Sequence, residues 1–213
     1  MSESGSNGDS QRRNENSFER RWGDHYSLIR QTHIFASVTR DVLESKYLSE
    51  VSPFVLSLSQ FHLLKLISLN GTHQVGEVAE FLGISGPAAT KNIDKLERLG
   101  LVERTPSRGD RRATLLSSSL KGRRLVERYE SHKQERLGPV LDQFTGEELH
   151  QLAGLLQRFS MALVEAEDEG DGLCLRCAAY FEESCPVSHV RGDCAYKRVH
   201  HSRVARPVVG SAG

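Results

Sequence analysis

The sequence lacks any run of about 18 apolar residues, the length that a helix needs to cross a lipid bilayer, so we expect no membrane span. Its first seventeen residues contain Met1 as their only apolar side chain, so they lack the apolar core of a secretion signal. Such a polar segment is typical of a disordered arm. These two absences predict a soluble cytoplasmic protein.

Several catalytic motifs are also absent. The chain holds no phosphate-binding glycine loop, no HExxH and no GxSxG, and its acids are dispersed over the surfaces of the expected helices. Cysteine does not occur before residue 174. The first absence argues against an enzyme, and the second confines thiol and metal–thiolate chemistry to the end of the chain.

The most informative pattern spans residues 75–116 and predicts two short helices followed by a basic hairpin. The first helix has apolar residues at the spacing of one helical face, at Val75, Val78, Ala79 and Leu82. Gly83 ends this helix. Ser85 is a good N-cap for the second helix, and Gly100 ends it.

The second helix of this pair has an outward face that suits a DNA major groove. Its inward stripe is apolar and consists of Ala89, Ile93 and Leu96. The outward side chains are short, amide-bearing or cationic, which are the groups that contact base edges and phosphates. We predict that the DNA-binding residues of this helix are Ser85, Pro87, Ala88, Thr90, Lys91, Asn92 and Lys95.

A turn-rich and strongly basic segment follows the second helix. Residues 103–105 and 113–116 can pair as strands around it. We predict further DNA contacts from its tip, by Arg108, Asp110, Arg111 and Arg112. Residues 85–124 hold ten basic and four acidic side chains, whereas the remainder holds 18 basic and 24 acidic ones. Positive charge gathered on one segment favours phosphate binding.

Longer helices are expected before the helix pair. Apolar residues recur at helical spacing over residues 18–47 and predict one long helix of about 40 Å. The helix pair and the hairpin, or wing, together form a small winged domain, which cannot cover that length, so part of the helix is expected to pack on another subunit. Ser57 with Gln60 is a capping-box signature for the next helix, and residues 72–74 leave room for a short strand that pairs with the wing.

Two more helices are expected after the hairpin. Ser119 can cap a helix from about Leu120 to Phe144, which Gly138-Pro139 will kink or interrupt. Thr145 and Glu148 form another capping box, which opens a last amphipathic helix. The first and last helices are the natural pair for forming a dimer.

The predicted fold class is mainly α with a small β-wing, in which dimerisation helices from both termini flank a winged helix-turn-helix domain. Two-fold symmetry would place two recognition helices roughly 34 Å apart, so the DNA site should be an imperfect palindrome. The expected segments are a disordered arm (1–17), a dimerisation helix (18–50), the winged domain (51–118), further dimerisation helices (119–168), a four-cysteine segment (169–196) and a basic flexible tail (197–213).

The sequence resembles the multiple-antibiotic-resistance regulator (MarR) family of bacterial winged-helix transcription factors, from about residue 28 to 164. The residues that carry the resemblance are LSLSQFHLLKL (56–66), the helix pair up to KLERLGLVERT, the wing signature Gly109-Asp110-Arg111-Arg112, and residues 116–122 leading into a long helix. The resemblance implies that the second helix lies in the major groove and that Arg111 or Arg112 enters the minor groove. The family usually stops after the last helix, where this chain continues.

All four cysteines lie in that continuation, at Cys174, Cys177, Cys185 and Cys194. In a cytosolic chain, such clustering favours a metal site over structural disulfides. One interpretation is an iron–sulfur cluster of the 2Fe–2S or 4Fe–4S type, held by the four thiolates. Zinc is the second interpretation, with His189 able to replace one cysteine. The third is thiol chemistry within the Cys174–Cys177 pair.

The favoured function is a homodimeric, sequence-specific regulator of transcription, expected to be a repressor, that binds double-stranded DNA. Its DNA affinity is expected to respond to redox or iron state through the four-cysteine site. One alternative is a zinc-stabilised regulator that senses a small organic ligand or thiol oxidation. Another is a thiol or electron-transfer redox protein, in which the helices only form a dimerisation scaffold.

Overall fold

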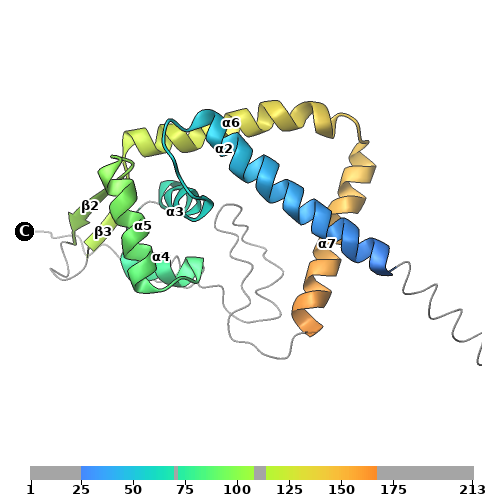
Figure 1. The fold of residues 1–213 in the computed structure, drawn as a ribbon, viewed down its shortest axis with the longest axis horizontal. Helices are drawn as coiled ribbons and strands as arrows, with labels where there is room; N and C mark the ends of the chain where they lie inside the picture. The colour runs from blue at the N-terminus through green and yellow to red at the C-terminus, as the bar shows by residue number, and fades with distance from the viewer. Residues whose placement is uncertain (1–24, 70–71, 108–113, 167–213) are drawn as a thin grey trace, which may run out of the picture. The chain divides into compact units, whose positions relative to one another are not determined.

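The computed structural model describes residues 25–69, 72–107 and 114–166, which form helices and one small antiparallel sheet (Figure 1). The predicted mainly α fold with a small β-wing is confirmed. Several predicted features lie outside the described residues: the arm at 1–17, the hairpin tip with Arg108, Asp110, Arg111 and Arg112, the four-cysteine segment with Cys174, Cys177, Cys185 and Cys194, and the tail at 197–213.

The elements follow one another in the predicted order. They are a helix over residues 25–38, η1 (Thr39–Lys46), α2 (Tyr47–Val51), α3 (Leu58–Leu69), β1 (His73–Gln74), α4 (Val75–Leu82), α5 (Gly86–Arg98), β2 (Val102–Pro106), β3 (Thr114–Ser118), α6 (Leu120–Leu141) and α7 (Gly146–Ala166). No helix in the described part of the chain combines the length and the apolar character that a bilayer span requires.

The chain divides into two compact units between Leu48 and Ser49. The described part of the first unit is helical without a break, as predicted, and the helix ends at Val51 rather than at Tyr47. Sequence periodicity did not predict that η1 is wound as a π-helix. The backbone N–H of Tyr47 reaches the carbonyl of Val42, five residues earlier, which is the π-helical hydrogen bond.

Helix α3 forms the centre of the second unit, where it packs against α5, α6 and β3. The predicted capping box at its start is confirmed: the Ser57 N–H donates to Gln60 Oε1 at 3.0 Å, and the Gln60 N–H donates to Ser57 Oγ at 3.3 Å. The core residues of this helix are Phe61, Leu63, Leu64, Leu66 and Ile67, all buried. Such a helix, apolar on most of its surface, is expected in the middle of a domain.

A buried charge pair joins α3 to α6. Lys65 is almost fully buried and pairs with Glu130, which also pairs with Lys133. Partial burial of Glu130 raises the pKa of its carboxyl, but hydrogen bonds and the positive charges of Lys133 and Lys65 outweigh this effect and leave the pKa below its ordinary value. The pair therefore stabilises the packing of α3 on α6 only while Glu130 is ionised, and this contribution is lost as the pH falls through the lowered pKa.

The sheet has three antiparallel strands in the order β1-β3-β2. The predicted short strand before α4 is confirmed, since His73 lies opposite Leu116 in β3. The predicted hairpin is also confirmed, with Arg104 opposite Leu116 and strands that extend slightly beyond the predicted limits. The sheet thus joins the start of the helix pair to the wing.

Helix α6 begins as predicted, with Ser119 Oγ accepting a hydrogen bond from the Gly122 N–H at 3.0 Å. Of the kink or interruption predicted at Gly138-Pro139, the interruption is wrong, because the helix continues to Leu141. Only two residues of the helix follow Pro139, so the lost backbone donor and the clash of its ring with the preceding turn affect the last turn of the helix alone. The prediction that the helix reaches Phe144 is also wrong, by one turn.

The capping box before α7 is confirmed. The Thr145 N–H donates to Glu148 Oε2 at 2.8 Å, and the Glu148 N–H donates to Thr145 Oγ1 at 3.2 Å. The hydrogen bond from the Thr145 backbone lowers the pKa of the Glu148 carboxyl. Local side-chain chemistry therefore sets the start of this helix, as the sequence indicates.

Candidate nucleic-acid interface

Helices α4 and α5 are joined by a turn of three residues. Gly83 ends α4 in the left-handed conformation, with φ 58°. Its N–H donates to the carbonyl of Glu80, and the N–H of Ile84 donates to the carbonyl of Ala79. A residue with a Cβ is strained in that conformation, so glycine suits this position. Ser85 then caps α5 by accepting a hydrogen bond from the Ala88 N–H. Both ends of the turn are as predicted, and they give a helix-turn-helix.

The first half of α5 presents the predicted DNA-binding residues to solvent. The apolar stripe is fully buried, with Ala89, Ile93 and Leu96 each 0% exposed. Around it, the exposed side chains are Ser85, Pro87, Thr90 and Lys91, with Ala88 partly exposed. Within the described chain, Lys91 makes no hydrogen bond or ion pair. The ammonium group of Lys91 is therefore available for a ligand of negative charge.

Two predicted DNA-binding residues in the second half of α5 bond to other parts of the domain. Asn92 Oδ1 accepts a hydrogen bond from Gln60 Nε2 of α3 at 3.3 Å. Lys95 Nζ donates to the carbonyl of Val55, in the segment before α3, at 2.8 Å. These bonds fix α5 against α3. Contact of Asn92 and Lys95 with DNA stays a prediction.

An arginine of the wing pairs with both acids of α5. Arg104 Nη2 of β2 lies 2.5 Å from Asp94 Oδ1, and Arg104 Nη1 lies 3.2 Å from Glu97 Oε2. Nothing in the sequence indicates this pair, because a contact between a strand and a helix leaves no spacing pattern in the sequence. The pair links the wing to α5 through charge as well as through packing.

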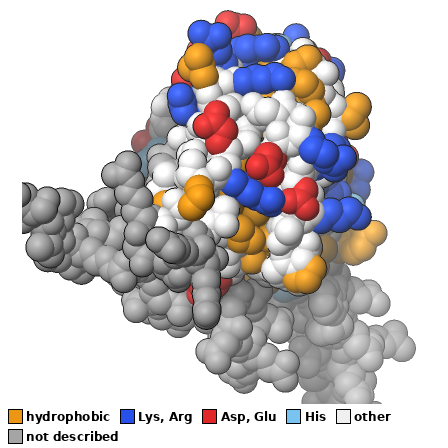
Figure 2. All heavy atoms as spheres, turned by 90° about the vertical axis from the view of Figure 1, so that its left-hand side faces the viewer, with side chains coloured by type: hydrophobic (Ala, Val, Ile, Leu, Met, Phe, Trp, Pro, Cys, Tyr) orange, Lys and Arg blue, Asp and Glu red, His pale blue; other side chains and the backbone are white. Residues whose placement is uncertain are grey.

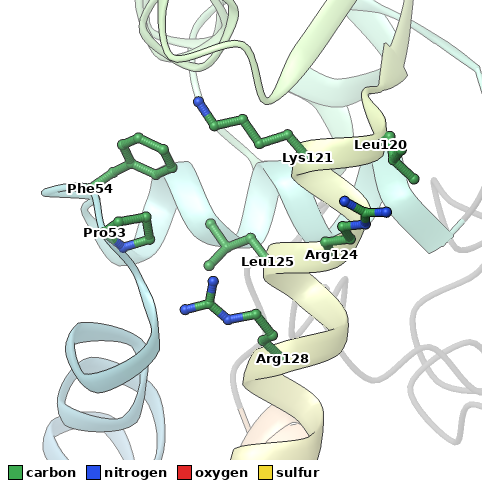
Figure 3. Close-up of a pocket in the computed structure, with 7 residues that line it drawn as sticks. All are labelled: Pro53, Phe54, Leu120, Lys121, Arg124, Leu125 and Arg128. Carbon is green, nitrogen blue, oxygen red and sulfur yellow. The ribbon is translucent and has the colours of Figure 1, made fainter.

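The C-terminal end of α5 is held by the start of α6. Lys121 Nζ donates to the carbonyl of Leu99 at 2.9 Å, and it lies 4.6 Å from the centre of the Phe54 ring (Figure 3). Ser119 Oγ donates to the carbonyl of Gly100 at 2.7 Å. A cation near the last carbonyls of a helix stabilises its negative end. Sequence reasoning counted Lys121 as positive charge and missed this role.

An open groove of about 370 Å³ lies beside Lys121 (Figure 3). It is lined by Pro53, Phe54, Leu120, Lys121, Arg124, Leu125 and Arg128. Arg128 donates a hydrogen bond to the carbonyl of Val51. Apolar side chains and three cations therefore meet between the segment before α3 and the start of α6.

Lys and Arg side chains gather over the side of the molecule that carries β2 and β3, with several acids among them (Figure 2). The exposed basic residues of α5 and the first turn of α6 are Lys91, Arg98, Lys121, Arg123 and Arg124. Arg123 Nη1 donates to the carbonyl of Ser118 at 2.7 Å. The excess of positive charge predicted for residues 85–124 thus includes side chains on the surface, where phosphates can approach.

The described residues 25–69, 72–107 and 114–166 contain no group of three or more His, Cys, Asp or Glu side chains that could hold a metal ion. Because the four predicted thiolate ligands lie outside these ranges, the metal site stays a prediction.

A helix-turn-helix, a basic hairpin and this strand order together form a winged helix domain. Residues 56–113 match the model of the MarR family. The match begins before α3 and covers α4, α5 and β2, as well as the hairpin tip. Residues 56–113 are therefore similar to the winged helix domain of the MarR family.

Solved structures from two bacteria have the same fold. Wild-type MarR from E. coli, in its apo form, is 25% identical and has a TM-score of 0.52, covering 62% of this chain and 95% of that chain. YusO from Bacillus subtilis is 26% identical and has a TM-score of 0.51, covering 67% of this chain and 97% of that chain. A mutant of E. coli MarR complexed with operator DNA is 24% identical, with a TM-score of 0.52, covering 65% and 96%.

Proposed function

We propose that this protein is a MarR-type transcription regulator that binds double-stranded DNA as a homodimer. The observation that carries the proposal is the exposed first half of α5, where Thr90 and Lys91 project from a helix-turn-helix next to a basic hairpin. Side chains of these types contact bases and phosphates when such a helix enters a major groove. The crystal structure of E. coli MarR with operator DNA supports the proposal, because that protein has the same fold.

Exposed apolar side chains support the homodimer. In the helix over residues 25–38 they are Tyr26, Leu28, Ile29, Ile34, Phe35 and Val38. In α7 they are Leu152, Leu155 and Leu163. Faces of this kind mark protein–protein contacts, since water disfavours large apolar patches. A two-fold axis between such helices would present two α5 helices to one face of DNA, which is why we expect an imperfect palindrome.

Binding to a DNA fragment from upstream of the protein's own gene tests this function. Replacing Lys91 with Ala should weaken binding to all DNA sequences alike and lower the slope of affinity against salt by about one, as expected for the loss of one phosphate contact. The control is Arg136→Ala, which removes a cation from the C-terminal half of α6, away from α5, and should leave the DNA affinity unchanged. Equal affinities for parent and Lys91→Ala at every salt concentration would remove α5 from the proposed interface.

We further propose that Cys174, Cys177, Cys185 and Cys194 hold an iron–sulfur cluster whose state controls DNA affinity. This proposal rests on the sequence alone, since four thiolates within 21 residues can surround one cluster. A brown sample with visible charge-transfer bands after anaerobic purification would support it, whereas colourless protein that contains zinc would favour a zinc site. If Cys185→Ser loses the metal but binds DNA with unchanged affinity under every redox condition, the cluster does not control DNA binding.

A further inference from the structure

Helix α5 carries an acid on the face that we assign to DNA. Asp94 lies three residues after Lys91 and four before Arg98, so the three side chains share one helical face. That face is opposite the buried stripe that contains Ile93. Glu97, also exposed, lies one turn after Asp94 at the edge of this face. Carboxylates on a surface that approaches DNA repel the phosphates.

The side chain of Arg104 reaches both of these carboxylates at once. Its two terminal nitrogens are used separately, one at 2.5 Å from Asp94 and the other at 3.2 Å from Glu97. The side chain of Arg104 is 29% exposed, whereas the side chains of Asp94 and Glu97 are 48% and 41% exposed. The acids therefore stay at the surface, and the arginine lies against them from the side of the wing. Arg104 thereby reduces the net charge of the cluster that it forms with Asp94 and Glu97 from −2 to −1.

We propose that Arg104 is a positioning residue that neutralises the acids of α5, so that the cations of this helix can approach DNA phosphates. The proposal rests on the proposed function of α5, and it assigns Arg104 a role other than direct contact with DNA. Removal of the arginine leaves two exposed carboxylates beside Lys91 and Arg98. Their repulsion from the phosphates should lower DNA affinity about tenfold at moderate salt.

A set of substitutions tests this role. Arg104→Met is made in the parent and in the Asp94→Asn/Glu97→Gln double variant, and DNA affinity is measured by fluorescence anisotropy. We expect a loss of about tenfold in the parent and less than twofold in the double variant, because the acids are then absent. The double variant itself should bind DNA at least as tightly as the parent.

Two other roles give different results. If Arg104 contacts a phosphate directly, Arg104→Met costs the same factor in both backgrounds, and the proposal is wrong. If Arg104 only clamps the wing to α5, the double variant also loses affinity, which overturns the proposal in another way. A parent protein that binds no DNA fragment at all would instead remove the proposed function, and this inference with it.

A matched control uses two exposed acids that Arg104 does not hold. In a Glu103→Gln/Glu127→Gln background, which has the same net charge as the acid-free background, Arg104→Met should still cost about tenfold. A loss of affinity below twofold in this background would mean that net charge alone explains the small effect of Arg104→Met in the acid-free background. It would overturn the proposal that Arg104 acts through Asp94 and Glu97. Thermal unfolding followed by circular dichroism shows whether each variant is folded. If Arg104→Met unfolds, Arg104→Lys is used in its place. We then expect DNA affinity to fall about threefold when Asp94 and Glu97 are present and to stay unchanged when they are replaced.

Discussion

The two halves of α5 differ in how they are held. From Ser85 to Lys91, side chains of the described structure bond only within the helix itself, as in the hydrogen bond from Thr90 Oγ1 to the carbonyl of Gly86. From Asn92 to Leu99, the helix bonds to α3, to the segment before α3, to β2 and to α6. The second half is the anchor and the first is the free surface. A helix that binds DNA needs both halves, because it must be held rigidly by the domain and still leave polar side chains unpaired for contact with DNA.

The largest effect on stability is expected from a substitution at Gly122, where α6 packs against the segment that follows α5. A Cβ at this position would lie 2.2 Å from the carbonyl oxygen of Leu101, just beyond the end of α5. In Gly122→Ala the overlap should cost about 3 kcal/mol, while better helix propensity returns about 1 kcal/mol, so the protein should lose about 2 kcal/mol of unfolding free energy. Urea denaturation measures this difference.

The control for Gly122 is another glycine of α6. A Cβ at Gly138 meets nothing within 4 Å, so Gly138→Ala should stabilise the protein by up to about 1 kcal/mol. If the two variants shift the urea midpoint in the same direction, the close approach of Leu101 to Gly122 does not determine the stability of Gly122→Ala.

A smaller effect is expected at Lys121, which holds the last carbonyl of α5 and lies over Phe54. Lys121→Met keeps the aliphatic chain and removes the ammonium, so it should destabilise the protein by about 1 kcal/mol. Arg124→Met is the matched control, because Arg124 makes no hydrogen bond or ion pair within the described chain. Equal melting temperatures for the two variants would show that Lys121 does not anchor α5.

The smallest effect on stability is expected in the free half. Lys91→Ala should change the free energy of unfolding by less than about 0.5 kcal/mol, since the side chain is exposed and bonds to nothing in the described structure. The same variant should show the clear loss of DNA affinity given above. A loss of stability close to that of Lys121→Met would erase the distinction between the two halves.

Sequence reasoning was correct where the determining chemistry is local. Gly83, Ser85 and Ser119 act on backbone groups within a few residues, so their spacing predicts the ends of α4, α5 and α6. The apolar stripe of α5 follows from helical periodicity in the same way. These signals fix the helix-turn-helix and therefore the face of α5 that points outward.

The anchoring contacts could not be predicted, because they join residues that are distant in the sequence. Lys121 and Leu99 belong to different helices, and the bond from Gln60 to Asn92 spans more than thirty residues. Only the folded arrangement of α3, α5 and α6 brings such groups together. At Pro139 a local rule was not sufficient, because the helix tolerates this proline two residues before its end at Leu141.

The ion pairs of Arg104 have a consequence for strand alignment. Along β2 the buried Val102 and the half-buried Arg104 share one face, whereas Glu103 and Thr105 are exposed on the other. A slip of one residue in the pairing of β2 with β3 would exchange these faces and could bring Glu103 towards Asp94 and Glu97. Three carboxylates would then repel one another, so the ion pairs of Arg104 with Asp94 and Glu97 also favour the observed register of the hairpin.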